Sequence, residues 1–180
     1  DCIGAMQFLP RGGDPGDPFR IEGAPQSEAE IAATIRDLAT SPLGMRADDT
    51  FRISLAGAQE KTAFLWHDGA WLKPAGLTPT THIFKRRMGV VSHGIDMTDS
   101  VENEWLCLKL AAAMGLPVND ARIATFEDQT VLVVTRFDGA PREKGSILRL
   151  PQEDFLQALG FESGQKYQEH GGPSMQDGLR

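Results

Sequence analysis

The sequence predicts an α+β fold in which one main helix lies across a mostly antiparallel sheet. Three observations support this prediction. Short β-type segments follow one another between residues 51 and 85, a longer helical segment lies between residues 100 and 114, and two further β-type segments lie between residues 121 and 136. Strands joined by short turns pair in antiparallel fashion, and a helix laid across such a sheet buries the apolar side of both elements.

One helix is predicted before the sheet. Residues 1–9 predict a short strand, and residues 10–26 are rich in glycine and proline, which is typical of a linker or a long loop. A helix begins after Ser27, which forms a capping-box pattern with Glu30. Proline and glycine at positions 42 and 44 end it. Its apolar stripe consists of Ile31, Ile35 and Leu38.

A hairpin and a third strand form the first half of the predicted sheet. Residues 62–67 and 70–73 flank Asp68-Gly69, a pair that tolerates the positive φ angles of a tight turn. Residues 81–85 are a third short β-type run, and a glycine-containing loop follows them. We expect these segments to lie side by side in one sheet.

The main helix is expected to begin at Ser100, as its cap, and to end at Gly115, with Pro117 beyond it. Cys107 lies within its apolar pattern and is therefore predicted to be an inert thiol in the core. The residues predicted to form the buried stripe are Val101, Trp105, Leu108 and Ala112, widened by Leu106, Leu110 and Ala113.

Two strands complete the predicted sheet, and the chain then leaves it. Residues 121–126 and 130–136 flank a short polar turn. Residues 131–134 are apolar without alternation, which is typical of a strand buried on both faces. Pro151 is expected to open a last short helix that ends near Gly160.

The composition limits the classes of function. The 180 residues have 41% hydrophobic content and a formal net charge of −7. This acidic balance argues against a chain that wraps nucleic acid by itself, because phosphate binding needs clustered Lys and Arg, but it permits a DNA-bound partner. Two distant cysteines form neither a disulfide scaffold nor a zinc site, so we expect a reducing cytoplasm. No stretch approaches the roughly 20 apolar residues of a membrane span.

A turn of small residues is the first candidate for chemistry. Residues 54–62 read Ser-Leu-Ala-Gly-Ala-Gln-Glu-Lys-Thr. Small residues allow backbone N–H groups to approach phosphate oxygens closely. The segment is neither a Walker A loop nor a G-x-G-x-x-G loop, because both require further glycines. On these residues alone, a tight connection between two strands explains the segment equally well.

Lys85 and the chain's exit from the sheet are the other candidates. Lys85 ends a predicted strand, and Glu104 lies 19 residues later, near the start of the main helix. In kinases a strand lysine contacts nucleotide phosphates and is held by a glutamate of the following helix. Glu102 is an alternative partner, and a solvated helix face explains the glutamates more simply. Residues 133–138 could bind adenine through their backbone, although a plain strand end also accounts for them.

Three segments resemble the HipA family of serine/threonine kinases, which are the toxins of bacterial type II toxin–antitoxin pairs. Residues 51–63 (FRISLAGAQEKTA) are similar to the family's phosphate-loop segment, and residues 78–85 (TPTTHIFK) to its lysine strand. Residues 148–155 (LRLPQEDF) resemble a signature downstream of the hinge. Residues 103–104 and 134–138 lie between these segments in the family's order. The resemblance covers nearly the whole chain from residue 51 onward.

This resemblance implies a protein-kinase-like N-lobe together with the tail of a small N-terminal subdomain. Residues 1–26 would form the end of that subdomain and a linker, and residues 27–50 a connecting helix. Residues 51–138 would form the N-lobe, with the phosphate loop, the ATP lysine, an αC-type helix and the hinge. Residues 139–180 would be the start of a truncated C-lobe, so we expect the chain to be a fragment of a longer protein.

The resemblance also implies a site for ATP with Mg²⁺. Lys85, oriented by Glu104, would bind the phosphates, and Ser54 matches the family's autophosphorylated serine. Many relatives carry Glu at the position of Thr135, so backbone contacts are the ones expected there. The backbone residues that would cradle the phosphates are Ala56, Gly57, Ala58, Gln59, Glu60 and Lys61, and those at the adenine edge are Thr135, Arg136 and Phe137.

The implied function is an ATP-dependent protein serine/threonine kinase toxin of the cytoplasm. Relatives phosphorylate aminoacyl-tRNA synthetases and arrest growth, which is associated with persistence. They are neutralised by a HipB-like helix-turn-helix antitoxin that supplies the DNA contacts. The catalytic Asp and the metal ligands are expected beyond Arg180, so the chain alone should be inactive. The alternative, from another class, is a non-catalytic kinase-like module that binds an antitoxin or another partner.

Overall fold

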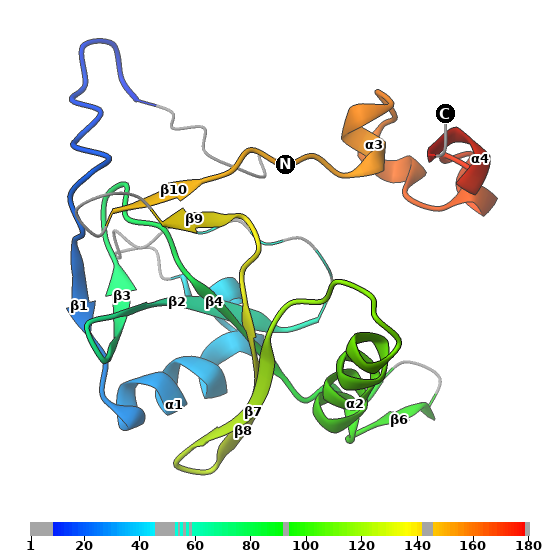
Figure 1. The fold of residues 1–180 in the computed structure, drawn as a ribbon, viewed down its shortest axis with the longest axis horizontal. Helices are drawn as coiled ribbons and strands as arrows, with labels where there is room; N and C mark the ends of the chain where they lie inside the picture. Colours follow the sequence, from blue (N-terminus) through cyan, green and yellow to red (C-terminus); the bar gives the residue numbers. More distant parts are fainter. Residues whose placement is uncertain are drawn as a thin grey trace.

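The computed structural model describes residues 9–45, 53, 55, 57, 59–91, 94–141 and 146–178. Its centre is a six-stranded sheet in the order β1-β3-β2-β4-β8-β7, in which every neighbouring pair is antiparallel (Figure 1). Helices α1 (Glu28–Arg36) and α2 (Ser100–Ala113) pack against this sheet. The predicted class, a mostly antiparallel sheet with few helices, is confirmed.

The strands of the sheet follow the β-type segments of the sequence. Their bounds are β1 (Gly23–Pro25), β2 (Lys61–His67), β3 (Ala70–Pro74), β4 (His82–Arg86), β7 (Ala121–Phe126) and β8 (Gln129–Thr135). Only β1 was not anticipated, because it lies in the segment predicted as a linker. It pairs with β3 at the edge of the sheet, where glycine and proline are tolerated. The strand predicted for residues 1–9 falls almost entirely outside the described residues.

The two hairpin turns of the sheet adopt positive φ angles. Asp68 and Gly69 have φ of 48° and 79°, as a type I′ turn between β2 and β3 requires. Glu127 has φ of 51° in the turn between β7 and β8. Arg36, the last residue of α1, forms ion pairs with both Glu127 and Asp128. The helix is thereby tied to the turn of the hairpin that it covers.

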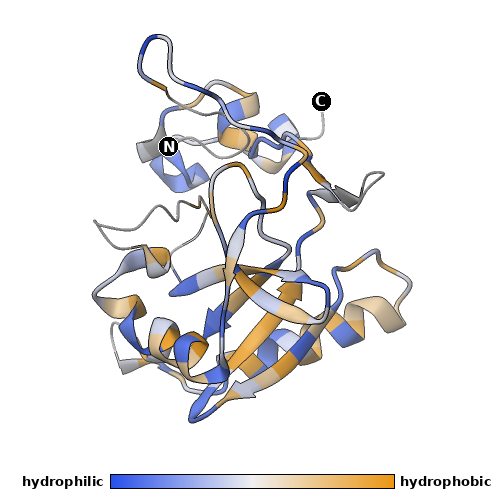
Figure 2. Cartoon of the chain, turned by 90° about the vertical axis from the view of Figure 1, so that its left-hand side faces the viewer, coloured by the Kyte–Doolittle hydropathy of each residue, from blue (hydrophilic) through white to orange (hydrophobic). Residues whose placement is uncertain are grey.

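Helix α1 covers one face of the sheet. The predicted capping box at its start is present, with the Glu30 amide donating to Ser27 Oγ and the Ser27 amide donating to Glu30 Oε2. Two short 3₁₀ helices, η1 (Asp37–Ala39) and η2 (Pro42–Gly44), follow it. Figure 2 shows that apolar residues are concentrated along the central strands. The core cluster on this side contains Ile31, Ala32, Ile35, Leu38, Phe64, Trp71, Phe84, Phe126, Val131 and Val133.

Helix α2 covers the opposite face. Along β8, residues 131 and 133 belong to the α1 cluster, whereas Leu132 and Val134 pack with Val101 of α2. Successive side chains of a strand point to opposite faces, so the two helices lie on opposite sides of the sheet. Strand β8 is therefore buried on both faces, as its unbroken apolar run predicts.

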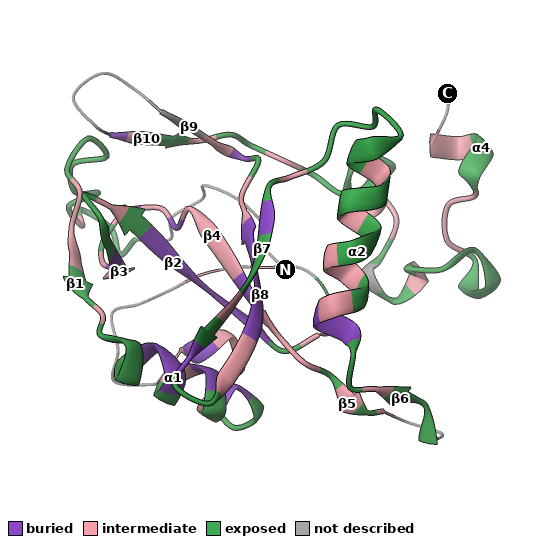
Figure 3. Cartoon of the chain, turned by 60° about the horizontal axis from the view of Figure 1, so that its bottom comes forward, coloured by how far each residue is buried: buried purple, intermediate pink, exposed green. Residues whose placement is uncertain are grey.

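Three predictions about α2 were wrong. The cap residue is Asp99, without a side-chain cap, and Ser100 Oγ instead accepts a hydrogen bond from the Met88 amide. Leu106 and Leu110 are 50% and 55% exposed, because the sheet reaches only under the first turns of the helix (Figure 3). Cys107 points to solvent for the same reason and is not a core thiol. Ala112 and Ala113 are exposed as well.

The remaining elements are short. Two-stranded sheets are formed by β5 (Gly89–Val90) with β6 (Asp96–Met97), and by β9 (Gly139–Pro141) with β10 (Ile147–Arg149). Beyond them lie α3 (Phe155–Ala158), η5 (Ser163–Gln165), η6 (Gln168–His170) and α4 (Met175–Gly178).

The helix expected to open at Pro151 begins at Phe155 instead, because Asp154 and Gln157 form the capping box that starts α3. The C-terminal group of short helices stands apart from the sheet in Figure 1. In the part of the chain that is described, no helix has the length and apolar character needed to cross a membrane.

The aromatic centre of the α1 cluster gives a stability prediction. The ring of Phe84 is fully buried, with centroids of Phe64 and Trp71 at 5.0 and 4.9 Å. Phe84→Ala should lower the free energy of unfolding by about 3–5 kcal/mol, because it removes a large side chain and leaves a cavity. Urea denaturation measures this change. The control Phe155→Ala, at a ring that is 65% exposed, should have a much smaller effect. Equal losses would contradict the placement of Phe84.

Candidate functional site

Two lysines face each other across neighbouring strands. Lys61, the first residue of β2, is the register partner of Lys85 in β4, and the partner of Lys85 in β8 is Leu132. Leu132 belongs to the α2 cluster, so both lysine side chains lie on the face of the sheet that carries α2. Like charges directly opposite each other in a sheet repel. The pair therefore concentrates positive charge that an anion can compensate.

Glu104 of α2 compensates one of these charges. Its Oε1 atom lies 2.5 Å from Lys85 Nζ, and the two side chains are 33% and 25% exposed. The structure thus brings together the two residues whose pairing the sequence suggested. Glu102, the alternative partner, lies on another face of the helix and pairs with Arg87. The ion pair fixes the side chain of Lys85, which lies directly opposite Lys61 on the neighbouring strand.

Lys61 was predicted for its backbone only, but its side chain is part of the arrangement. The side chain is nearly buried, and Nζ donates to the carbonyl oxygens of Gly57 at 2.7 Å and Gln59 at 3.0 Å. Burial lowers the pKa of Lys61, and the charge of Lys85 lowers it further. No sequence motif marks this side chain, although a lysine opening a strand after a glycine turn could have drawn attention.

The loop before β2 is tied down by the residues that follow it. Gln59 Nε2 donates to the carbonyl of Arg86 at 2.9 Å, and the Glu60 carboxylate pairs with Arg86 at 3.0 Å. These two side chains anchor the loop to β4, so only their backbone remains for the predicted cradle. Gly57 has φ of 101°, a conformation that favours glycine. Ser54, Ala56 and Ala58, which were also predicted for this site, lie outside the described residues.

An apolar row runs beside the lysine row on the same face. Ala63, Ile83, Val134 and Ala121 are register partners across β2, β4, β8 and β7. Each lies two residues along its strand from the row that contains Lys61 and Lys85, a separation of about 7 Å. Ala63, Ala121 and Val134 are buried and Ile83 is partly exposed, so a mostly buried apolar row lies next to the charged one.

The exit from β8 is only partly available to a ligand. The Thr135 amide donates to the Asp120 carbonyl and the Arg136 amide to the Thr81 carbonyl, both at 2.8 Å. The Arg136 side chain is 7% exposed and pairs with Asp138, so it points away from a ligand. Phe137, in contrast, is 67% exposed. Of the three residues predicted for the adenine edge, Arg136 is committed to the protein, whereas the Thr135 carbonyl and the Phe137 amide have no backbone partner among the described loop and turn residues.

Asp138 is the centre of a buried charge cluster beside this exit. Arg136 donates to both of its carboxylate oxygens, at 2.9 and 2.7 Å, and Arg149 donates to Oδ1 at 2.7 Å. Burial alone would raise the pKa of Asp138, but the hydrogen bonds from the two arginines outweigh burial and lower the pKa to about 2. The sequence does not reveal this cluster, because Arg149 lies 11 residues from Asp138 and is brought to it only by the fold, although Arg136 is two residues away.

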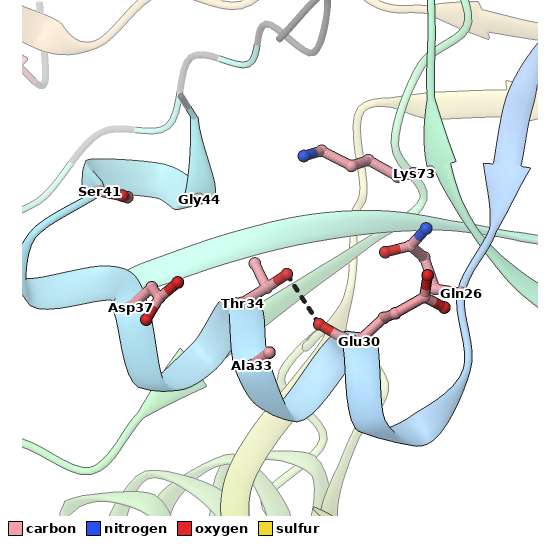
Figure 4. A pocket seen from close by; sticks show the side chains of 8 residues that line it. All are labelled: Gln26, Glu30, Ala33, Thr34, Asp37, Ser41, Gly44 and Lys73. Atoms are coloured by element: carbon pink, nitrogen blue, oxygen red, sulfur yellow. Dashed lines mark hydrogen bonds between the residues drawn. The ribbon is translucent and has the colours of Figure 1, made fainter. Parts of the chain in front are cut away.

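The described part of the molecule also has cavities away from the lysine pair. One of about 560 Å³ borders the loop and is lined by Gln59, Glu60, Arg86 and Arg87 among others. Another of about 260 Å³ lies between α1 and Lys73, where Glu30, Thr34 and Lys73 face a common space (Figure 4). The second cavity is on the α1 side of the sheet, so it is separate from the lysine pair. Among the described residues, no group of three or more His, Cys, Asp or Glu could hold a metal ion.

Comparison with known proteins identifies relatives along most of the chain. A family model described as the HipA-like C-terminal domain matches residues 53–180. The protein Y4mE of Sinorhizobium fredii, named as a kinase, is 34% identical over 180 residues, which cover 98% of this chain and 41% of the relative. The serine/threonine-protein kinase toxin HipA of Shewanella oneidensis is 30% identical over 175 residues, which cover 96% of this chain and 37% of the relative.

A solved structure agrees with these relatives. The chain superposes on a structure of the Shewanella oneidensis HipA, HipB and operator DNA complex with a TM-score of 0.66 and 27% sequence identity. The match covers 100% of this chain and 40% of that chain. The chain therefore spans about two fifths of the length of the relatives that it matches. The kinase-like architecture predicted from the sequence is confirmed.

The low pKa of Asp138 predicts how stability depends on pH. The pKa falls from the ordinary value of 3.8 to about 2 on folding, so the carboxylate stabilises the fold fully above about pH 5 and loses this effect as the pH falls toward 2. The difference in unfolding free energy between the protein and Asp138→Asn should shrink by roughly 2 kcal/mol over this range. Urea titrations between about pH 2.5 and 6 measure it. A constant difference would contradict the ion pairs.

Proposed function

Because this chain belongs to the HipA family, we propose that it forms the nucleotide-binding part of an ATP-dependent protein serine/threonine kinase. The face of the sheet that carries α2 would bind ATP, with its phosphates at Lys61 and Lys85 and its base over the apolar row. Two relatives are named as kinases, which supports a kinase activity for the family. The residues of this chain support the nucleotide site, as follows.

The lysine pair with Glu104 is the observation that carries the proposal. Two ammonium groups and one carboxylate leave a net positive charge on a partly buried face. The phosphates of a nucleoside triphosphate would reduce the repulsion between the two lysines. Their oxygens would take the place of the Gly57 and Gln59 carbonyl oxygens as acceptors for Lys61 Nζ. Glu104 would keep Lys85 extended toward the phosphates, which is the role of the helix glutamate in protein kinases. A surface that only bound another protein would have no need of this arrangement.

The adenine ring would lie beside the chain's exit from β8. The ring would lie over the apolar row at Ile83, which is partly exposed between the buried residues Ala63 and Val134. The carbonyl of Thr135 could accept a hydrogen bond from the adenine amino group, and the amide of Phe137 could donate one to a ring nitrogen. Thr135 is the last residue of β8, and Phe137 opens the turn that follows, so both groups lie at the same end of the strand. In this proposal the base would lie at the apolar row and the phosphates at the lysine row, in the order that they have in the nucleotide.

Phosphoryl transfer needs groups that we do not assign to the described residues. Mg²⁺ would be carried by the phosphates of the nucleotide, and it would neutralise charge that develops during transfer. An aspartate that orients the acceptor hydroxyl and carboxylates that hold the metal are required as well. We expect these in a C-lobe of a longer protein, and we propose no catalytic residue in this chain.

We also propose a partner and a target for the kinase, by analogy with its relatives. The solved relative is a complex with HipB and its operator DNA. We propose a HipB-like antitoxin as partner, with DNA contacted indirectly, since the net charge of −7 disfavours direct binding. A protein target such as an aminoacyl-tRNA synthetase, the cytoplasm as location and a role in persistence belong to the same proposal.

Substitution of Lys85 tests the nucleotide site. Lys85→Met should weaken ATP binding about 10- to 100-fold, because it removes a charge-assisted contact to the phosphates. Isothermal titration calorimetry with Mg-ATP measures the affinity. The control Lys109→Met changes an exposed lysine of α2 outside the site and should leave affinity unchanged.

A second pair of variants separates the glutamates. Glu104→Gln should weaken ATP binding, whereas Glu102→Gln, which loses only its pairing with Arg87, should not. Unchanged ATP affinity in both Lys85→Met and Glu104→Gln would support the non-catalytic interaction module instead.

Ser54 provides a test of regulation. It precedes the phosphate loop, and a dianionic phosphate on it would compete with ATP for the same backbone amides and switch the kinase off. Incubation of active full-length protein with Mg-ATP should yield a phosphate on Ser54, detected by mass spectrometry. Ser54→Ala should then retain activity over time. An unmodified Ser54 after such incubation would contradict autophosphorylation.

A further inference from the structure

The three residues at the exit from β8 alternate sharply in exposure. The side chains of Arg136 and Asp138 are 7% and 3% exposed, whereas Phe137 between them is 67% exposed. The flanking backbone is fixed as well, since the Arg136 amide binds the Thr81 carbonyl and the Asp138 carbonyl accepts from the Leu150 amide. Phe137 is therefore held out from the surface by its two neighbours.

Arg149 joins this exit to two other segments. It lies in β10, and its guanidinium donates to Asp138 Oδ1 at 2.7 Å and to the Thr80 carbonyl at 2.8 Å. Thr80 directly precedes the segment that leads into β4, the strand of Lys85. We call Arg136, Asp138, Arg149 and Thr80 the exit clamp. It connects the exit from β8, the entrance to β4 and the β9–β10 hairpin through buried, charge-assisted hydrogen bonds.

Stability alone is a weak reason for such a clamp. Burying three charges requires their removal from water, and apolar residues of similar size often stabilise a fold as well or better. Arg136 and Arg149 share the single carboxylate of Asp138, so the cluster contains one buried positive charge that has no carboxylate of its own. What the clamp offers over apolar packing is directionality, because each guanidinium fixes the geometry of the groups that it binds. In this clamp the fixed groups lie on both sides of Phe137, so they set the direction in which the Phe137 side chain points.

We propose that Asp138 and Arg149 are positioning residues that hold Phe137 and its amide at the adenine position. The inference rests on the nucleotide site proposed above. The clamp residues themselves would not touch the nucleotide, because their charged groups are buried in contacts with one another and with Thr80. By ordering Phe137 before the base arrives, they would reduce the entropy lost on binding. The lysine pair, on the next row of the sheet, would not depend on them.

Binding of whole ATP, compared with binding of its phosphate part alone, distinguishes positioning of Phe137 from a general loss of structure. Tripolyphosphate occupies only the phosphate position, whereas ATP also uses the base position. Asp138→Asn and Arg149→Gln should weaken binding of Mg-ATP about tenfold and leave tripolyphosphate binding nearly unchanged. Arg149→Gln leaves the Arg136–Asp138 pair intact, so it serves if Asp138→Asn folds poorly. Ile35→Val, which removes a methyl group from the α1 cluster, is the control for lowered stability and should change neither affinity.

Calorimetry on the unmodified protein and these variants gives distinct outcomes. A rise in the ratio of ATP to tripolyphosphate dissociation constants in both clamp variants, with faster hydrogen exchange at the Phe137 amide, would support the inference. Equal weakening of both ligands, or an unchanged ratio, would overturn it and leave the nucleotide site standing. Failure of the unmodified protein to bind either ligand would overturn the proposed function, and the inference with it.

Discussion

The pairing register between β2 and β4 determines what this face of the molecule presents. It places Lys61 opposite Lys85, and the pairing of β4 with β8 extends the same row to Leu132 under α2. A shift of the register by one residue would turn every side chain of a strand to the other face. Lys85 would then face α1 and lose Glu104. The buried residues Phe64 and Phe84 prevent such a shift, because each would have to leave the core of the α1 face.

The sheet thus keeps its larger hydrophobic cluster and the lysine pair on different faces. The α1 face holds the larger cluster with its four buried aromatic side chains, Phe64, Trp71, Phe84 and Phe126. Helix α2 covers this face only with its first turns. Of the two rows, Lys85 and Ile83 are partly exposed, whereas Lys61, Ala63, Leu132 and Val134 are buried. Helix α2 buries Val101 and packs Trp105 and Leu108 against this face, so it brings Glu104 to Lys85 with little apolar burial of its own.

Much of this arrangement could be predicted from the sequence. Strand positions followed from β-type runs and turn pairs such as Asp68-Gly69, and the partnership of Lys85 with Glu104 followed from a known kinase pattern. The contribution of the Lys61 side chain could not be predicted, because it depends on register across strands. Exposure of Cys107 and Leu110 depends on how far the sheet extends beneath α2, which no helical periodicity reveals. The clamp around Asp138 joins residues that are distant in sequence, and its charges resemble an ordinary polar loop.

The two hydrophobic clusters share no residue, although β8 contributes to both. Substitutions in clusters that are not in contact tend to change stability additively. Evolution could therefore adjust the α1 cluster to a new temperature or a new partner on that side without disturbing the lysine face. The same separation offers protein engineers a practical choice of where to mutate. Stabilising changes belong under α1, where they leave the lysine pair and Glu104 untouched.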